Sequence, residues 1–195
     1  MPSLFVLSGP SGAGKDAVLQ GMKDAGLAFY HAITMTTRPQ RAGERDGVDY
    51  HFTSEEYFKD MIERDDLLEW AEVYGHRYGV PRQSVEQALG RGEDVIVKVD
   101  VQGAKTIKER MPGAMLLFLT TSSREEQEER LKGRSTESAA ELELRLATFH
   151  DEMKSLPFFD YIVVNRQGEL DSAVSRITAI ITAERCRVSP HTTSL

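Results

Sequence analysis

A glycine-rich loop between a short apolar run and a helix start most constrains what this chain can fold into. The segment Gly-Pro-Ser-Gly-Ala-Gly-Lys-Asp at positions 9–16 follows Leu4–Leu7. Glycines accept backbone angles closed to other residues, so successive N–H groups can turn toward a phosphate at the positive end of a helix dipole. The lysine adds a mobile cation for the outer phosphates of a nucleotide. The pattern predicts a nucleotide-binding P-loop made of Gly9, Pro10, Ser11, Gly12, Ala13, Gly14, Lys15, Asp16 and Ala17.

The last motif position differs from the usual pattern. P-loops normally end in Ser or Thr, whose hydroxyl binds the Mg²⁺ of the nucleotide, and this chain has Asp16 there. We therefore expect nucleotide binding to survive with an altered metal site. The simpler alternative is a glycine-rich turn that only caps a helix, and the flanking strand and helix patterns argue against it.

Size and composition limit the classes of function. The chain has 195 residues, 40% of them hydrophobic, which suffices for one domain with a buried core. A formal net charge of -7 argues against nucleic-acid and anionic-membrane partners. The single cysteine, Cys186, cannot form an internal disulfide, which fits a reducing compartment. Together with an N-terminus that lacks a signal-peptide pattern, these features predict a cytoplasmic protein.

Short apolar runs alternate with helical patterns along the chain. The runs are nearly continuous, as in strands buried on both faces, and the helices end at Gly or Pro. This alternation predicts an α/β fold, a P-loop parallel sheet flanked by helices. The expected strands are Leu4–Leu7, Val95–Val99, Met115–Leu119 and Tyr161–Val164, and the expected helices are Asp16–Ala25, Arg82–Leu89, Val101–Met111 and Leu170–Glu184.

Two stretches interrupt the alternation. Residues 34–82 contain turn residues, alternating segments at Val48–Phe52 and Glu69–Tyr74, and a helical pattern from Ser54 to Arg64, which together predict an inserted mixed α+β lobe. Residues 122–155 are charge-dense and helical. They are either a solvated helical hairpin with i,i+4 ion pairs or a lid that brings arginines over bound phosphates.

Residues beyond the P-loop carry a family resemblance. Thr34–Glu44 has the sequence Thr-Met-Thr-Thr-Arg-Pro-Gln-Arg-Ala-Gly-Glu, and Gly-Val-Asp-Tyr, Leu-Glu-Trp and Tyr-Gly follow at positions 47–50, 68–70 and 78–79. With the P-loop, these segments resemble guanylate kinase over nearly the whole chain. The resemblance implies a single domain over residues 1–187, with a core at 1–33, 83–125 and 156–187, a GMP-binding lobe at 34–82, a helical lid at 126–155, and a frayed tail at 188–195.

The lobe carries residue types suited to a nucleoside monophosphate. Arg38 and Arg41 can offer two guanidinium groups to one dianionic phosphate, and the hydroxyls of Tyr50 and Tyr78 can donate to it. The tyrosines could instead be packing aromatics. Glu69 can accept from both N–H groups of the guanine edge, whereas adenine presents an acceptor at N1 and would repel a carboxylate. Glu69 could instead be a solvated strand residue, but its apolar neighbours make an unpaired carboxylate costly.

The resemblance implies transfer of the ATP γ-phosphoryl group to GMP or dGMP, with Mg²⁺ accompanying ATP. It also implies that Thr34 contacts GMP, that Arg130 and Asn165 contact ATP, and that Asp100 lies between the two nucleotides, where it could bind Mg²⁺ waters or the GMP base edge. Because Asp16 stands at the position of the usual metal-binding hydroxyl, we hypothesise that its carboxylate faces the metal. Lys15, Arg134 and Arg145 are the expected catalytic residues. Because the phosphate acceptor is already anionic, positioning and charge neutralisation would suffice without a protein nucleophile. A monomer and a homodimer are both compatible with the sequence.

Two further positions depart from the family pattern. Lys98 stands where an acidic residue is usual, and Val80 stands where a hydroxyl usually touches guanine. One hypothesis is a charge-swapped arrangement in which Asp16 takes the metal-facing role and Lys98 pairs with Asp16 or reaches a phosphate. The alternative is that Lys98 points elsewhere and Asp16 only caps its helix. Two other functions stay open, a ribose bisphosphokinase-like enzyme and an inactive guanylate-kinase-like binding module.

Overall fold

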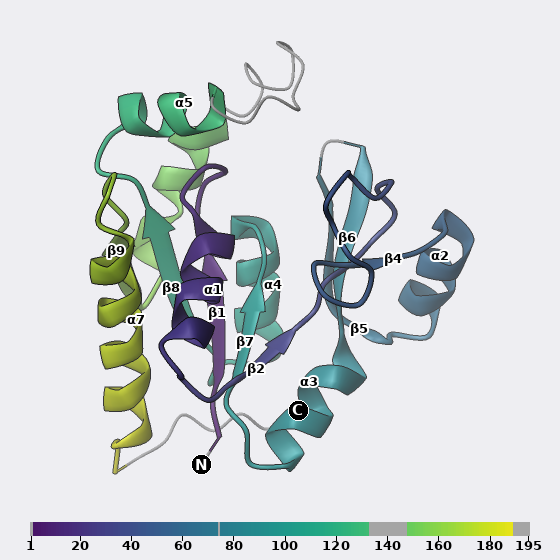
Figure 1. Cartoon of the computed structure of the whole chain (residues 1–195). Helices are drawn as coiled ribbons and strands as arrows, with labels where there is room; N and C mark the ends of the chain where they lie inside the picture. The colour runs from purple at the N-terminus through teal and green to yellow at the C-terminus, as the bar shows by residue number, and fades with distance from the viewer. Residues whose placement is uncertain (1, 74, 133–147, 189–195) are drawn as a thin grey trace. The chain divides into compact units, whose positions relative to one another are not determined.

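The computed structural model describes residues 2–73, 75–132 and 148–188 (Figure 1). The described residues fall into two compact units. The first unit comprises residues 2–6 and 29–114, and the second comprises residues 7–28 and 115–188. Strand β1 (Leu4–Ser8) contributes residues to both units and is buried along its whole length.

A parallel strand pair in the first unit consists of β2 (Tyr30–Ala32) and β7 (Val95–Lys98). Ala32 lies opposite Val97 in the register. The β7 residues Val95–Val97 are buried, and helix α3 (Arg82–Gly90) packs against both strands. A continuous apolar run is what such burial requires.

The first unit also holds a four-stranded sheet in the order β4-β3-β6-β5. Met35 of β3 packs with Phe58 and Met61 of α2 and with Leu67 of β5 to form a small core. Helix α2 starts where the Ser54 side chain accepts a hydrogen bond from the Tyr57 N–H at 3.1 Å. Helix α4 packs against β5. The bounds are β3 (Met35–Thr36), β4 (His51–Phe52), β5 (Leu67–Val73), β6 (His76–Pro81), α2 (Glu55–Glu63) and α4 (Val101–Arg110).

The second unit pairs two parallel strands and packs helices beside them. Strand β8 (Met115–Thr120) is fully buried and pairs with β9 (Tyr161–Val164). Helix α1 (Lys15–Asp24) packs against α7 (Leu170–Arg185), and Figure 1 shows the two side by side. Helix α5 (Arg124–Lys132) follows β8, and a short 3₁₀ helix (η1, Leu156–Phe158) precedes β9.

The predicted α/β fold class is confirmed, because parallel strands are flanked by helices and the expected strands and helices form within about one residue of their predicted bounds. The segment Val48–Phe52 is a correction, because only His51–Phe52 is a strand. Val48 and Asp49 form a turn in which both N–H groups donate to the Arg45 carbonyl. The sequence patterns did not predict β2, β3 and β6.

The division into core, lobe and lid stays a prediction, although the four-stranded sheet lies inside the range predicted for the lobe. Helix α5 contains two i,i+4 ion pairs, Arg124–Glu128 and Arg130–Glu126, as the charge-dense helical pattern suggested in general terms. Across the described ranges, no helix combines the length and apolar character needed to cross a membrane.

Candidate nucleotide-binding site

The P-loop has the backbone that its sequence predicts. Gly9, Gly12 and Gly14 all have positive φ, at 130°, 85° and 91°, and Gly14 is the N-cap of α1. The Lys15 ammonium donates to the carbonyl oxygens of Gly9 at 2.6 Å and Pro10 at 3.1 Å, so it lies across its own loop. A bound phosphate would offer the ammonium charged acceptors in place of these carbonyls, which strengthens its hydrogen bonds.

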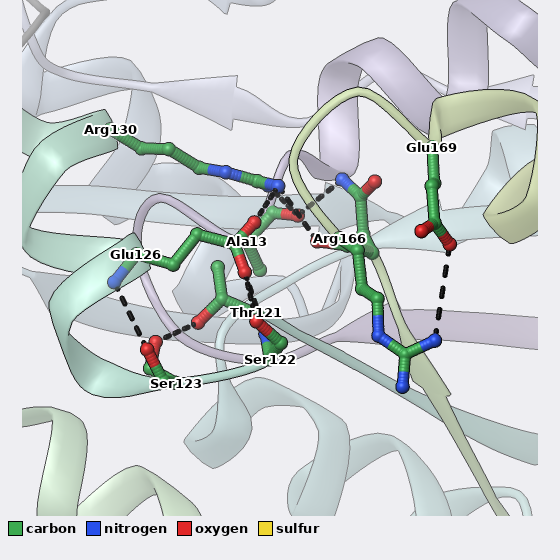
Figure 2. A network of polar contacts seen from close by, with 9 residues as sticks. Ala13, Thr121, Ser122, Ser123, Glu126, Arg130, Arg166 and Glu169 are labelled. Carbon is green, nitrogen blue, oxygen red and sulfur yellow. Dashed lines mark hydrogen bonds and ion pairs between the residues drawn. The ribbon is translucent and has the colours of Figure 1, made fainter.

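Two side chains outside the loop hold its Ala13 carbonyl. Asn165, at the end of β9 and only 4% exposed, donates to it at 2.9 Å, and Arg130 of α5 lies 3.4 Å from it. Arg130 also donates to the Asn165 carbonyl at 2.7 Å and pairs with Glu126 (Figure 2). Gly14 makes this approach possible, because a Cβ there would lie 2.5 Å from the Asn165 amide nitrogen.

A third contact fixes the loop and was not predicted from the sequence. Gln127 of α5 is fully buried and donates to the Ser11 carbonyl at 2.7 Å. Gln127 stands among charged residues in α5, and this uncharged amide was a usable sign of a buried position. A buried polar side chain needs a specific hydrogen-bonding partner. The predicted ATP-side residues Arg130 and Asn165 and the unpredicted Gln127 thus converge on the P-loop backbone.

A pocket of about 410 Å³ opens beside the loop in the second unit. Its volume is in the range of small-molecule sites. The segment Arg166–Gly168, directly after β9, forms part of its wall and was also missed by the sequence analysis. The lining residues are Gly12, Gly14, Ala17, Arg130, Asn165, Arg166, Gln167, Gly168 and Leu170.

Asp16 is exposed in the first turn of α1. Because Gly14 is the N-cap, the alternative that Asp16 caps the helix is wrong. A carboxylate in the first turn is still favoured by the helix dipole. Its position next to Lys15 leaves it beside the phosphate-binding segment.

The first unit brings the predicted phosphate-clamp residues together. The Arg38 guanidinium, on a side chain only 8% exposed, lies 5.5 Å from the ring centroid of Tyr50. The Tyr50 and Tyr78 rings meet edge-on at 6.0 Å. Burial lowers the pKa of Arg38, but hydrogen bonds with Glu44 and Tyr78 outweigh it and raise this pKa above its usual value. Arg41 is exposed on the same loop.

Glu44 organises this clamp, although the sequence analysis assigned it no role. One of its oxygens accepts from the Arg38 guanidinium at 2.7 Å and the other accepts from the Arg41 backbone N–H at 2.8 Å. Burial raises the pKa of Glu44, but these hydrogen bonds dominate and hold it below its usual value. The sequence offered one sign of this contact, because Glu44 follows Arg38 by six residues in a turn-rich segment that can fold back on itself.

Glu69 is the most perturbed carboxyl of the described residues. It is 2% exposed in β5, and burial together with the nearby Asp100 charge raises its pKa to about 8, while Arg110 opposes the shift. Val80, fully buried, lies opposite Glu69 in the β5–β6 register and supplies an apolar neighbour where a hydroxyl is usual. A buried carboxyl of this kind needs a hydrogen-bonding partner, which a guanine edge provides.

Thr34 and Asp100 flank the end of β7. The Thr34 hydroxyl donates to the Lys98 carbonyl at 3.3 Å, which leaves its oxygen lone pairs for an N–H donor such as the guanine amino group. Asp100 is the N-cap of α4, and its Oδ1 accepts from the Gly103 N–H at 2.7 Å. Lys98, between them, extends its ammonium to Tyr50.

Two predicted catalytic residues, Arg134 and Arg145, lie outside the described residues. The remaining predicted site residues divide between the units. Thr34, Arg38, Arg41, Tyr50, Glu69, Tyr78 and Asp100 belong to the first, and Gly9–Ala17, Arg130 and Asn165 belong to the second.

The described residues place a P-loop with its lysine in one unit, and a cationic and aromatic clamp with a buried carboxyl in the other. These features are those of a P-loop nucleotide kinase. The guanylate kinase family model matches residues 1–184. "Guanylate kinase 2, chloroplastic/mitochondrial" from Oryza sativa subsp. japonica is 42% identical over 195 residues, covering 100% of this chain and 68% of the rice protein. "Guanylate kinase" from Caldanaerobacter subterraneus subsp. tengcongensis is 44% identical over 185 residues, 95% of this chain and 89% of that protein.

Among solved structures, guanylate kinase from Anaplasma phagocytophilum aligns with a TM-score of 0.78 at 28% identity, covering 96% of this chain and 88% of the other. The chain therefore belongs to the guanylate kinase family. Members of this family are ATP:GMP phosphotransferases.

Proposed function

We propose that this chain transfers the γ-phosphoryl group of ATP to the phosphate of GMP or dGMP, giving ADP and the nucleoside diphosphate. The observation that carries the proposal is the buried Glu69 carboxyl, in the same unit as the Arg38–Tyr50–Tyr78 clamp. A carboxylate accepts from guanine N1–H and the amino group together, and the clamp suits a phosphate dianion. The pair fits a guanine nucleotide better than an adenine nucleotide.

In this account the chemistry needs no protein nucleophile. An oxygen of the GMP phosphate attacks the γ-phosphorus, and the bond from that phosphorus to the ADP oxygen breaks. The P-loop N–H groups and Lys15 bind the ATP phosphates, while Arg38 and Arg41 hold the acceptor phosphate. Their contribution is positioning and neutralisation of charge that spreads over the transferred group.

Magnesium is the metal that this donor set fits. Asp16 offers an exposed carboxylate in the first turn of α1, and Asp100 offers one at the start of α4. Mg²⁺ prefers carboxylate, phosphate and water oxygens. We propose that these two carboxylates and the ATP phosphates would hold Mg²⁺, which when bound neutralises phosphate charge.

One part of the proposal rests on the family resemblance, namely that Arg134 and Arg145 would act on the transferred phosphoryl group from the lid. The single cysteine, which fits a reducing compartment, favours a cytoplasmic enzyme. The enzyme would be a monomer or a homodimer. The alternatives, a ribose bisphosphokinase-like enzyme and an inactive binding module, are less well supported. Relatives named guanylate kinase match at 42 and 44% identity, and the P-loop keeps its lysine.

A coupled ADP-release assay tests the proposal. With ATP and Mg²⁺, GMP and dGMP should be phosphorylated far better than AMP or ribose 1,5-bisphosphate, and Lys15→Met should remove the activity. Removal of Mg²⁺ with EDTA should also stop turnover. Turnover of ribose 1,5-bisphosphate alone would support the ribose kinase, and GMP binding without turnover would support the binding module.

A further inference from the structure

Lys98 reaches from the end of β7 to one of the clamp tyrosines. Its ammonium nitrogen lies 3.4 Å from the Tyr50 hydroxyl oxygen and 4.8 Å from the centroid of the Tyr50 ring. An ammonium group has only donors, so the tyrosine oxygen accepts this hydrogen bond. The hydroxyl hydrogen of Tyr50 must then point away from Lys98, where it can donate to a different acceptor.

The Tyr50 ring therefore has two cations close to it, Lys98 and Arg38. Arg38, Arg41 and Lys98 carry three positive charges, and Glu44 supplies one negative charge within this group. The balance is positive, which suits a phosphate dianion. A donating tyrosine hydroxyl aimed away from the ammonium adds a directional hydrogen bond to that charge.

The backbone of Lys98 is held rigidly and contacts a second predicted GMP residue. Its carbonyl accepts the Thr34 hydroxyl, and Val97 before it pairs with β2 in a fully buried strand. A side chain that starts from a rigid strand positions its partner more accurately than one on a loop. One residue thus connects Thr34 on the base side with Tyr50 on the phosphate side.

We propose that Lys98 is a positioning residue of the acceptor site, which orients the Tyr50 hydroxyl and adds a third positive charge for the phosphate dianion of a nucleoside 5′-monophosphate. The sequence left three possibilities for Lys98, namely pairing with Asp16, reaching a phosphate or pointing elsewhere. The contact with the clamp residue Tyr50 favours the second. The inference rests on the proposed function, because it takes this half of the site to bind GMP.

Calorimetric titration of the full chain without ATP or metal tests the inference, using GMP and guanosine as probes. Lys98→Met removes the charge and keeps much of the side-chain volume. It should weaken GMP binding by roughly tenfold to 150-fold, the range for one charge-assisted hydrogen bond. Guanosine affinity should not change, and Lys98→Arg should restore most of the GMP affinity.

A second background tests whether Lys98 acts through Tyr50. In a Tyr50→Phe chain, Lys98→Met should change the free energy of GMP binding by at most half of the change that it causes in the wild type. Unchanged GMP binding in Lys98→Met, or an equal loss of affinity for GMP and guanosine, would overturn the inference. The proposed function would still stand in that case, provided that the wild type binds GMP. Failure of the wild type to bind GMP would overturn both.

Discussion

Glu69 packs against the first turn of α4 at Gly103. A Cβ built on Gly103 would lie 2.7 Å from Oε2 of Glu69 and 3.0 Å from its Cδ. Such contacts are shorter than carbon and oxygen atoms accept, so the carboxyl keeps its position only because residue 103 has no side chain. The same turn carries Asp100, whose charge contributes to the raised pKa of Glu69.

Gly103→Ala should therefore displace the Glu69 carboxyl and raise the KM for GMP by roughly tenfold, with a smaller effect on kcat. Alanine is the better helix former by about 1 kcal/mol, so any loss of thermal stability should be modest. Gly90→Ala is the matched control, because a Cβ at this helical glycine meets nothing within 4 Å. Steady-state kinetics of both variants make the comparison, and equal KM values would contradict the packing argument.

GMP binding should depend on pH through Glu69. Its pKa of about 8 in the free protein means that the protonated carboxyl must lose its proton before it can accept from guanine. GMP affinity should therefore rise from about pH 7 to about pH 8.5, by roughly fivefold to tenfold. This window lies above the second ionisation of a phosphate monoester, near about 6.

The Glu69→Gln variant is the control for this pH dependence, since its amide does not titrate. Calorimetry in two buffers of different ionisation enthalpy should also detect proton release when GMP binds to the wild type near pH 7. A flat pH profile for the wild type would contradict the assignment. Folding stability should change with pH in the opposite direction from GMP affinity. Between about pH 4.5 and about pH 8 the folded state keeps the Glu69 proton that the unfolded state loses, so the free energy of unfolding falls as pH rises.

Val80→Ser should lower the pKa of Glu69. The two residues lie opposite each other in the β5–β6 register, and a hydroxyl there can hydrogen-bond to the carboxylate form. GMP affinity at about pH 7 should rise twofold to tenfold, roughly the effect of one neutral hydrogen bond, and the pH profile should move to lower pH. Val80→Ala is the control, because it also removes buried apolar volume but offers no hydroxyl, and the same affinity in both variants would count against the argument.

Asn165→Asp should weaken ATP binding specifically. The substitution keeps the shape of the side chain but places a carboxylate oxygen where the amide now donates to the Ala13 carbonyl at 2.9 Å. The ATP KM should rise by roughly tenfold, because the P-loop loses a buried hydrogen bond and gains repulsion. GMP affinity, measured by calorimetry without ATP, should stay at the wild-type value, and a parallel loss would show that the variant is generally misfolded.

Much of the fold could be predicted because its signals are local. The P-loop glycines need positive φ, and β7 and β8 are continuous apolar runs because they are buried. Strand β6, in contrast, does not show an alternation of apolar and polar residues in its sequence. It exists because β3 and β5 pair with it on both sides, and pairing partners distant in sequence leave no periodic signal.

The candidate site follows the same division. Arg38, Tyr50 and Glu69 could be proposed because their segments resemble guanylate kinase, and the chemistry of a guanine nucleotide then supports a role for each of them. The contacts of Gln127 and Lys98 join distant parts of the chain, since 116 residues separate Gln127 from Ser11, whereas the hydrogen bonds of Glu44 are local. The sequence can mark such a residue as unusual, as it does for Gln127 and Lys98, but it does not reveal which distant residue each one contacts.

Base selectivity tests the central claim most directly. The kcat/KM for GMP and for AMP should be measured with ATP and Mg²⁺ in the wild type and in Glu69→Gln. The wild type should strongly prefer GMP, and the variant should lose roughly tenfold to thousandfold in kcat/KM for GMP, because an amide N–H would face the guanine donors. Activity with AMP should not fall in parallel. Unchanged GMP kinetics in Glu69→Gln would contradict the account.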